Sequence, residues 1–168
     1  MNKETIKNNF FTVIKDLGIE CKICEHEPVL NFEKAREIDA RFGLTGKESK
    51  SLFIKGKSGK YYIYMTTEDK RMDSKKIKQI VNEKVSVVNS EEMQSILGCE
   101  PGCLPPFGYD NNVIDTIIID KAIKEHEKFI CSCGIPEMTI EIDTNHLDSI
   151  LKNSYMNVRE YDENEITN

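Results

Sequence analysis

The sequence has no long apolar run and none of the common nucleotide-binding or hydrolase motifs. No stretch approaches the roughly 18 apolar residues that a membrane span needs, and residues 1–7 carry no apolar signal core. We therefore expect a cytoplasmic protein with no membrane partner. No Gly-x-x-x-x-Gly-Lys-Ser/Thr loop, no Gly-x-Gly-x-x-Gly and no Gly-x-Ser-x-Gly elbow occurs. These absences argue against the usual phosphate-loop and dinucleotide sites, and we expect no cofactor.

Histidine is scarce, and cysteine is poorly spaced for a metal. Two of the three histidines, His126 and His146, lie in polar, exposed contexts, and no local signature supports a Cys–His nucleophilic pair. Six cysteines fall in three close pairs, which a cytoplasmic protein would keep reduced. Only Cys21-x-x-Cys24, with His26 nearby, has a usual zinc spacing, but strand alternation puts its two thiols on opposite faces. We assign no metal and expect buried or incidental thiols; a cysteine-ligated metal site stays open as an alternative.

The composition is that of one globular domain. The chain has 168 residues, of which 39% are hydrophobic and 31% charged. Its net charge of −6 argues against indiscriminate nucleic-acid binding, so no DNA partner is expected. A local basic face remains possible, because two clusters are rich in cations: Lys47, Lys50, Lys55, Lys57 and Lys60, then Lys70, Arg71, Lys75, Lys76 and Lys78. Each cluster is either a solvated face or part of an RNA-binding surface.

Hydrophobic spacing predicts helices and strands in mixed order. Helices are expected at 3–17, 32–42, 73–81, 90–98 and 144–153, with Asn31, Asp73 and Ser90 as N-caps. Strands are expected at 19–26, 50–55, 60–66, 85–88, 113–119, 129–132 and 137–142. The order lacks a regular βαβ alternation, which favours an α+β fold with a mostly antiparallel or mixed sheet. We expect one domain over 1–154 and an acidic tail over 155–168 that frays.

Two stretches stand out as candidate functional segments. Residues 98–109 hold three Gly and three Pro, so they cannot continue a helix or a central strand. Such a rigid, irregular path is either a plain turn or a loop that presents several backbone N–H groups to one point. The second stretch, 48–55, is a strand that opens on Lys50. A lysine beside a loop of backbone donors suits binding of an anion or carbonyl group better than covalent catalysis.

A series of short motifs resembles a known family. In chain order they are His26-x-Pro28, Glu33-Lys-Ala35, Lys50-Ser-Leu-Phe-Ile-Lys55, Gly59-Lys-Tyr-Tyr, Asp69-Lys-Arg-Met-Asp73, Ser90-Glu-Glu and Leu97 through Gly108. Over about residues 20–152 the sequence resembles the YbaK/ProX family of free-standing aminoacyl-tRNA deacylases, which are related to the editing domain of bacterial prolyl-tRNA synthetases. The lysine strand and the Gly102-x-x-x-Pro106 loop together make the resemblance specific.

The resemblance implies a fold, an activity and a set of site residues. The fold would be a curved, barrel-like mixed sheet with surrounding helices, and the activity would be hydrolysis of the ester joining a wrong amino acid to tRNA. The family's invariant lysine falls on Lys50, which would bind the terminal phosphate or hold the ester. Its Gly-x-x-x-Pro loop falls on Gly102, Cys103, Leu104, Pro105 and Pro106, followed by Phe107, whose backbone would grip the aminoacyl group. The predicted tRNA face comprises Lys47, Lys55, Lys57, Lys70, Arg71 and Lys75.

The amino acid removed stays open. Branches that clear alanine carry Asn after the lysine and a later Phe-His-Pro-like motif, whereas this chain has Ser51 and no later histidine there. Its Ser132-x-Gly134 resembles the branch that clears cysteine from tRNA(Pro). Ser51, Ser132, Gly134 and His26 are further pocket candidates, although Ser132 and His26 could simply be satisfied by local hydrogen bonds. The alternative function is a catalytically silent aminoacyl- or prolyl-binding module that acts as a regulator or as a prolyl-tRNA synthetase partner.

Overall fold

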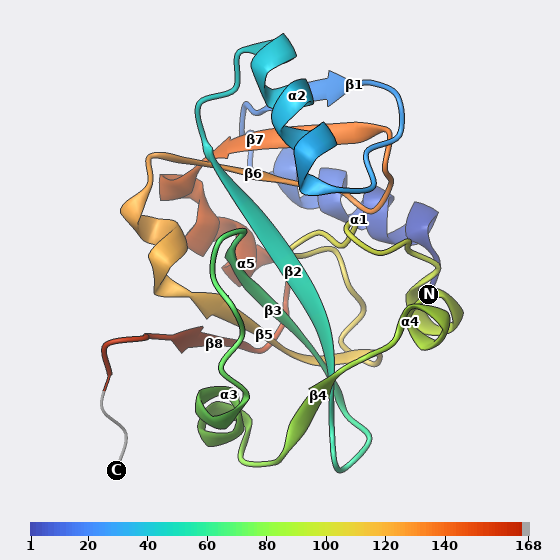
Figure 1. Cartoon of the computed structure of the whole chain (residues 1–168), viewed down its shortest axis with the longest axis vertical. Helices are drawn as coiled ribbons and strands as arrows, with labels where there is room; N and C mark the ends of the chain where they lie inside the picture. The colour runs from blue at the N-terminus through green and yellow to red at the C-terminus, as the bar shows by residue number, and fades with distance from the viewer. Residues whose placement is uncertain (166–168) are drawn as a thin grey trace.

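The computed structural model describes residues 1–165 and is an α+β fold built on one mixed sheet (Figure 1). The strands are β1 (Lys22–Glu25), β2 (Lys47–Gly56), β3 (Tyr61–Thr67), β4 (Val85–Val87), β5 (Ile114–Asp120), β6 (Lys128–Cys131), β7 (Met138–Asp143) and β8 (Val158–Tyr161). The helices are α1 (Lys3–Asp16), α2 (Phe32–Phe42), α3 (Ser74–Val81), α4 (Ser90–Leu97) and α5 (Leu147–Asn153), with 3-10 turns at Lys121–Glu125 and Thr144–His146. These bounds confirm the predicted α+β class.

Local capping sets where the helices begin and end. The side chains of Asn2, Asn31 and Asp73 accept hydrogen bonds from the first turns of α1, α2 and α3. Gly43 ends α2 in the left-handed conformation that glycine adopts without a steric cost. The predicted cap of α4 was wrong by one residue, because Asn89 rather than Ser90 accepts from the first turn.

The long strand β2 joins two parts of the sheet. Its start pairs in parallel with β6, its middle runs antiparallel to β3, and its end pairs with β4. The full order is β1-β7-β6-β2-β3-β5-β8, and β6 and β7 run across the direction of β2 and β3 (Figure 1). Within residues 1–165 the edge strands β1 and β8 do not pair, so the curved sheet is open and does not close into a barrel.

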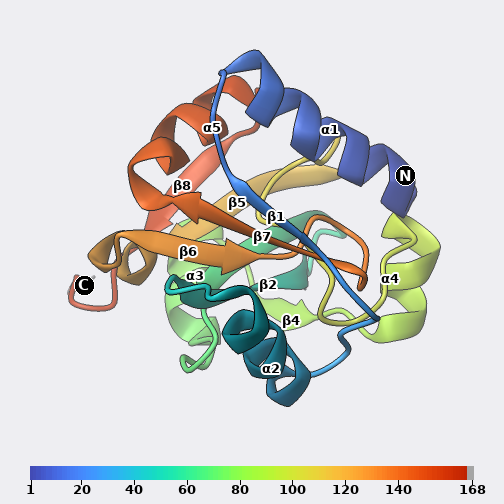
Figure 2. The same ribbon diagram turned by 90° about the horizontal axis from the view of Figure 1, so that it is seen from above.

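Helices cover the sheet on more than one side. Figure 2 shows α1 and α5 on one side of β6 and β7, with α2 on the other. The larger core cluster gathers Ile6 and Phe10 of α1, Ile117 of β5 and Ile150 of α5. A second cluster packs α3 and β8 against the opposite face of β3 and β5, through Ile77, Tyr64 and Tyr161. The strand predicted at 113–119 is buried on both faces, as its apolar run indicated.

Two expectations about strands were wrong. Lys50 does not open its strand: β2 begins at Lys47, so Lys50 is its fourth residue. Residues 158–161, expected to fray with the acidic tail, instead form β8, which pairs in parallel with β5. The rest of that tail after 165 lies outside the described residues. Within residues 1–165 no helix is long and apolar enough to cross a membrane.

Candidate functional site

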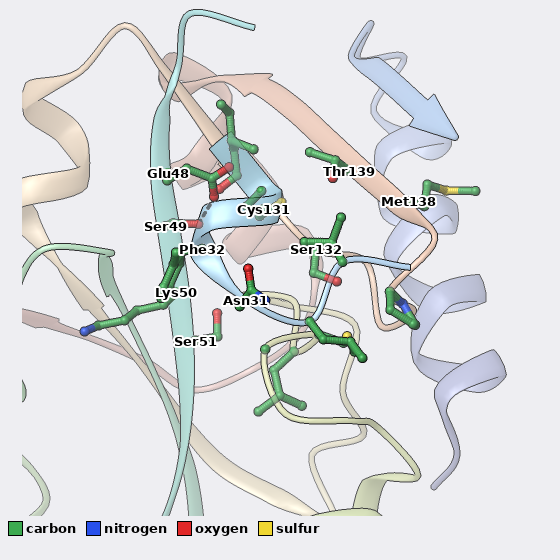
Figure 3. Close-up of a pocket in the computed structure, with 18 of the residues that line it drawn as sticks. Asn31, Phe32, Glu48, Ser49, Lys50, Ser51, Cys131, Ser132, Met138 and Thr139 are labelled. Carbon is green, nitrogen blue, oxygen red and sulfur yellow. Dashed lines mark hydrogen bonds between the residues drawn. The ribbon is translucent and has the colours of Figure 1, made fainter. Parts of the chain in front are cut away.

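A pocket of about 360 Å³ opens between α2, β2, the Gly/Pro loop and the β6–β7 turn (Figure 3). Its wall comes from four segments far apart in the sequence: 29–35, 48–52, 102–104 and 130–139. Six of the predicted site residues line it, namely Lys50, Ser51, Gly102, Cys103, Leu104 and Ser132. Five do not: His26, Pro105, Pro106, Phe107 and Gly134.

Lys50 stands at the edge of the pocket with its ammonium directed outward. In Figure 3 its side chain extends away from Asn31 and Ser132. Partial burial lowers the pKa of Lys50, and Arg71 adds to this lowering, whereas Asp69 and Glu68 oppose it. Among residues 1–165 no carboxylate lies within ion-pair distance of the Lys50 amine, although Lys47 pairs with Asp69 at 3.4 Å. Lys50 is therefore available to an anionic group at the pocket mouth.

Internal contacts hold the Gly/Pro loop rigid. Tyr109 Oη donates a 2.6 Å hydrogen bond to the Pro105 carbonyl, and the Phe107 ring stacks on Phe10 of α1 with centroids 4.3 Å apart. Pro105, Pro106 and Phe107 are consequently buried. Their side chains pack in the core and support the loop, and the predicted backbone contact with the substrate stays a prediction.

The pocket-facing part of this loop offers free backbone donors. Gly102 adopts a φ of +84°, which an L side chain rarely accepts. The Cys103 amide donates to the Glu100 carbonyl at 3.1 Å, but within the described chain the Gly102 and Leu104 amides have no such acceptor. Amides of this kind can bind a carbonyl oxygen or a developing oxyanion.

The β6–β7 turn contributes Ser132, whose hydroxyl is partly satisfied locally. Ser132 Oγ donates to the Ile135 carbonyl at 3.4 Å and accepts from the Gly134 amide at 3.3 Å. The first distance is long, so the hydroxyl can turn toward a ligand. Gly134 faces α1: a Cβ there would lie 3.4 Å from the Lys3 carbonyl. Gly134 thus packs against α1, and its predicted contact with the substrate stays a prediction.

His26 lies behind the pocket wall, where local hydrogen bonds fix it. Its Nδ1–H donates to the Glu27 carbonyl at 2.7 Å, which leaves Nε2 to accept from the Thr139 hydroxyl at 2.8 Å. Thr139 itself lines the pocket. His26 can therefore orient that hydroxyl, but it is not itself part of the pocket wall.

The sequence interpretation missed Glu48 as a pocket residue. Glu48 lines the pocket on β2 and lies against Asp39 of α2, whose Oδ1 is buried without a hydrogen-bond partner in the described chain. Desolvation and the neighbouring Asp39 raise the pKa of Glu48 to about 9. The Glu48–Asp39 pair therefore holds a proton above the usual pH range of a carboxyl group, and its protonated member can donate a hydrogen bond. A Glu between Lys47 and Ser49 resembles a surface position, so the sequence carried no signal for this.

The pocket thiols are poor nucleophiles. Burial raises the pKa of Cys103 to about 12, and that of Cys131 well above its ordinary value. Both remain protonated at neutral pH, which argues against a cysteine nucleophile. Among residues 1–165 no group of three His, Cys, Asp or Glu side chains is arranged to hold a metal ion.

The predicted tRNA-facing cations differ in their availability. Lys55 pairs with Glu92 at 2.7 Å, Lys70 pairs with Asp120 at 2.9 Å, and Lys47 pairs with Asp69 as above. Lys57, Arg71 and Lys75 are exposed and have no ion pair among residues 1–165. Arg71 lies close enough to Lys50 to affect its pKa, so these two extend one positive region at the pocket mouth.

Comparison with known proteins gives matches in sequence and in structure. A family model described as an aminoacyl-tRNA editing domain matches residues 31–150. The solved structure of the hypothetical protein APE2540 is similar, with a TM-score of 0.75 and 18% identity over 90% of this chain and 97% of its own. A protein described as a trans-editing enzyme for prolyl-tRNA synthetase has a TM-score of 0.69 and 18% identity, over 92% of this chain and 95% of its own.

Proposed function

Because this chain belongs to the aminoacyl-tRNA editing domain family and is an aminoacyl-tRNA deacylase, we propose that it clears misacylated tRNA(Pro) in trans. The amino acid removed would be alanine or cysteine. A tRNA substrate also implies a cytoplasmic protein, and prolyl-tRNA synthetase would be its functional partner. The observation that carries this proposal is the convergence of Lys50, Ser51, Gly102, Leu104 and Ser132 on one pocket from three distant segments.

The pocket suits hydrolysis of an ester that is already activated. Water would add to the ester carbonyl carbon, and the bond to the ribose oxygen would then break, which releases a free amino acid and a tRNA hydroxyl. The Gly102 and Leu104 amides, which have no backbone acceptor in the described chain, would receive the carbonyl oxygen as its negative charge grows. One such donor contributes roughly 3 kcal/mol of transition-state stabilisation in known cases. This chemistry needs no protein nucleophile, which agrees with the protonated pocket thiols.

The outward-directed charge of Lys50 on β2 would fix the orientation of the substrate. Lys50 extends outward and would bind the phosphate of the terminal nucleotide, so the aminoacyl group would enter between the loop and the β6–β7 turn. Hydroxyls of Ser51, Ser132 and Thr139 line that inner region and could hold the attacking water. A pocket of this size admits a small side chain, and hydrolytic editing is needed where binding separates small side chains by only about 1–3 kcal/mol.

A deacylation panel tests the proposal. Ala-, Cys-, Ser- and Pro-tRNA(Pro) would each be incubated with wild type, with Lys50→Ala and with Lys152→Ala, an exposed lysine of α5 away from the pocket. We expect rapid loss of one misacylated species, a kcat/KM about 10- to 100-fold lower in Lys50→Ala, and no change in Lys152→Ala.

Two results would count against the proposal. Full activity of Lys50→Ala would show that this lysine has no role in substrate binding or hydrolysis. If none of the four substrates is hydrolysed but tRNA still binds, the silent binding module is favoured. Ser51 in place of the family's Asn and the missing later histidine are the sequence features that suggest this alternative.

A further inference from the structure

Resting on the proposed function, we infer that the pocket mouth is a nucleotide-base subsite in which the Phe32 ring stacks on the terminal adenine of the tRNA. The aminoacyl ester is attached to this nucleoside, so the base must lie just outside the aminoacyl pocket. Phe32 would be a substrate-positioning residue that neither the family's loop motif nor the lysine strand identifies.

Phe32 is held at the pocket edge with its ring accessible. It is the first residue of α2, and Asn31 fixes this end of the helix by accepting from the Lys34 amide at 2.8 Å. Ile38 is fully buried, but Phe32 is 39% exposed and lines the pocket. Its ring therefore offers a flat apolar surface to a ligand at the mouth.

The surroundings of Phe32 suit a nucleotide better than an apolar partner. Phe32 of α2 and Lys50 of β2 both line this pocket. The two nearby acids already have other cations: Asp69 pairs with Lys47 at 3.4 Å and Glu68 with Arg36 at 3.8 Å. Lys50 is thus left for a phosphate beside an exposed aromatic ring. A nucleotide carries both matching groups, a base that can stack on the ring and a phosphate that can pair with the lysine.

The inner pocket combines hydrogen-bonding and apolar groups that suit an aminoacyl group. Ser51, Ser132, Thr139 and Glu48 line it beside apolar side chains such as Met138. The only large exposed apolar side chains of the lining are Phe32 and Leu30, the latter 63% exposed, within residues 1–165. Both belong to the mouth, and only Phe32 has a ring face on which a base can stack.

The absence of tryptophan from the sequence allows a direct test of stacking. In Phe32→Trp the new indole is the single tryptophan, and adenine stacked on it should quench its fluorescence. We expect saturable quenching by AMP, none by ribose 5-phosphate, and weaker AMP binding when Lys50→Ala is added. Leu30→Trp, on the same rim, is the matched control and should be quenched far less.

A kinetic experiment tests the same inference through the reaction. Phe32→Leu keeps an apolar side chain but loses the ring face, and should raise KM for aminoacyl-tRNA about 5- to 100-fold with little change in kcat. Phe32→Trp should restore KM, and hydrolysis of the corresponding aminoacyl ethyl ester, which lacks a base, should be equal in all three proteins.

The outcomes separate this inference from the proposed function. If wild type deacylates its substrate and Phe32→Leu has the same KM, the base subsite is overturned and the editing activity stands. Equal quenching of both tryptophan variants by AMP would overturn the subsite in the same way. Quenching that is specific to Phe32→Trp, in a protein that hydrolyses no aminoacyl-tRNA, would support the subsite and refute the proposed function.

Discussion

Glu48 and Lys50 are two residues apart on β2, yet their environments give them opposite roles. The Lys50 ammonium extends outward, where it has no acidic partner within ion-pair distance in the described chain. Glu48 lies against Asp39, and two adjacent carboxyl groups in a desolvated position cannot both ionise. The pocket therefore changes from cationic at its mouth to neutral and hydrogen-bonding inside. That gradient matches a substrate with a phosphate at one end and an uncharged ester carbonyl at the other.

The protonated state of Glu48 predicts a pH-dependent stability. Its pKa rises from 4.5 to about 9 on folding, so the unfolded chain releases this proton at a lower pH than the folded protein does. Its contribution is thus fully present below pH 4.5 and is lost as the pH rises toward 9. Because Gln does not titrate, Glu48→Gln should raise the Tm relative to wild type, and by more at pH 8 than at pH 5. Thermal unfolding at both pH values measures this.

Glu20→Gln, at an exposed position between α1 and β1, is the control for removing one negative charge, and its Tm difference should not vary with pH in this way. An equal Tm difference at pH 5 and pH 8 for Glu48→Gln would mean that Glu48 is ionised in the folded protein.

At the scale of elements, α1 holds the Gly/Pro loop in place from outside the pocket. Phe107 is fully buried and stacks on Phe10. Phe107→Ala should lower the free energy of unfolding by about 3–5 kcal/mol, the usual range for removing a buried phenylalanine. It should also reduce kcat/KM at temperatures well below the Tm of the variant, because the Gly102 and Leu104 amides would lose their fixed position. Chemical denaturation and deacylation assays measure the two effects.

Phe11→Ala is the matched control, since Phe11 touches Phe10 edge-on at 5.2 Å but is only half-buried. It should cost less stability and leave kcat/KM intact. Loss of stability without loss of activity in Phe107→Ala would show that the loop keeps its geometry without α1.

Local patterns predicted most helices, whereas pairing between distant strands escaped them. The spacing of Ile6, Phe10 and Ile14 and the cap at Asn31 depend on neighbours a few residues away, which the sequence displays directly. Strand β8 is four residues long with only Tyr161 buried, and it exists because β5 offers a parallel edge far away in sequence. The same limit applies to the site: Lys50 and Gly102 carried local signals, but the pKa of Glu48 is raised because the fold buries it and α2 brings Asp39 against it.

At the scale of the whole molecule, the net charge of −6 and a tRNA substrate are compatible only if cations are concentrated on one face. Internal ion pairs already use Lys47, Lys55 and Lys70 of the predicted face. Lys57, Arg71 and Lys75 of that face are left, and Lys50 at the pocket mouth adds a fourth cation, so tRNA would contact few phosphates. Affinity should then be modest and should fall with salt less steeply than for a strongly basic protein.

Counterion release turns this small set of cations into a measurable slope. Each phosphate contact contributes about 0.7 to 0.9 to the fall of log K with log salt, so four contacts predict a slope near −3. Arg71→Ala or Lys75→Ala should each weaken tRNA binding and make the slope shallower by about one contact, whereas Lys152→Ala should change neither. Binding of tRNA(Pro) to each protein over a KCl series gives these slopes. If neither Arg71→Ala nor Lys75→Ala changes the slope, the tRNA body binds to another face of the protein. The Lys50 region would then contact the terminal nucleotide alone.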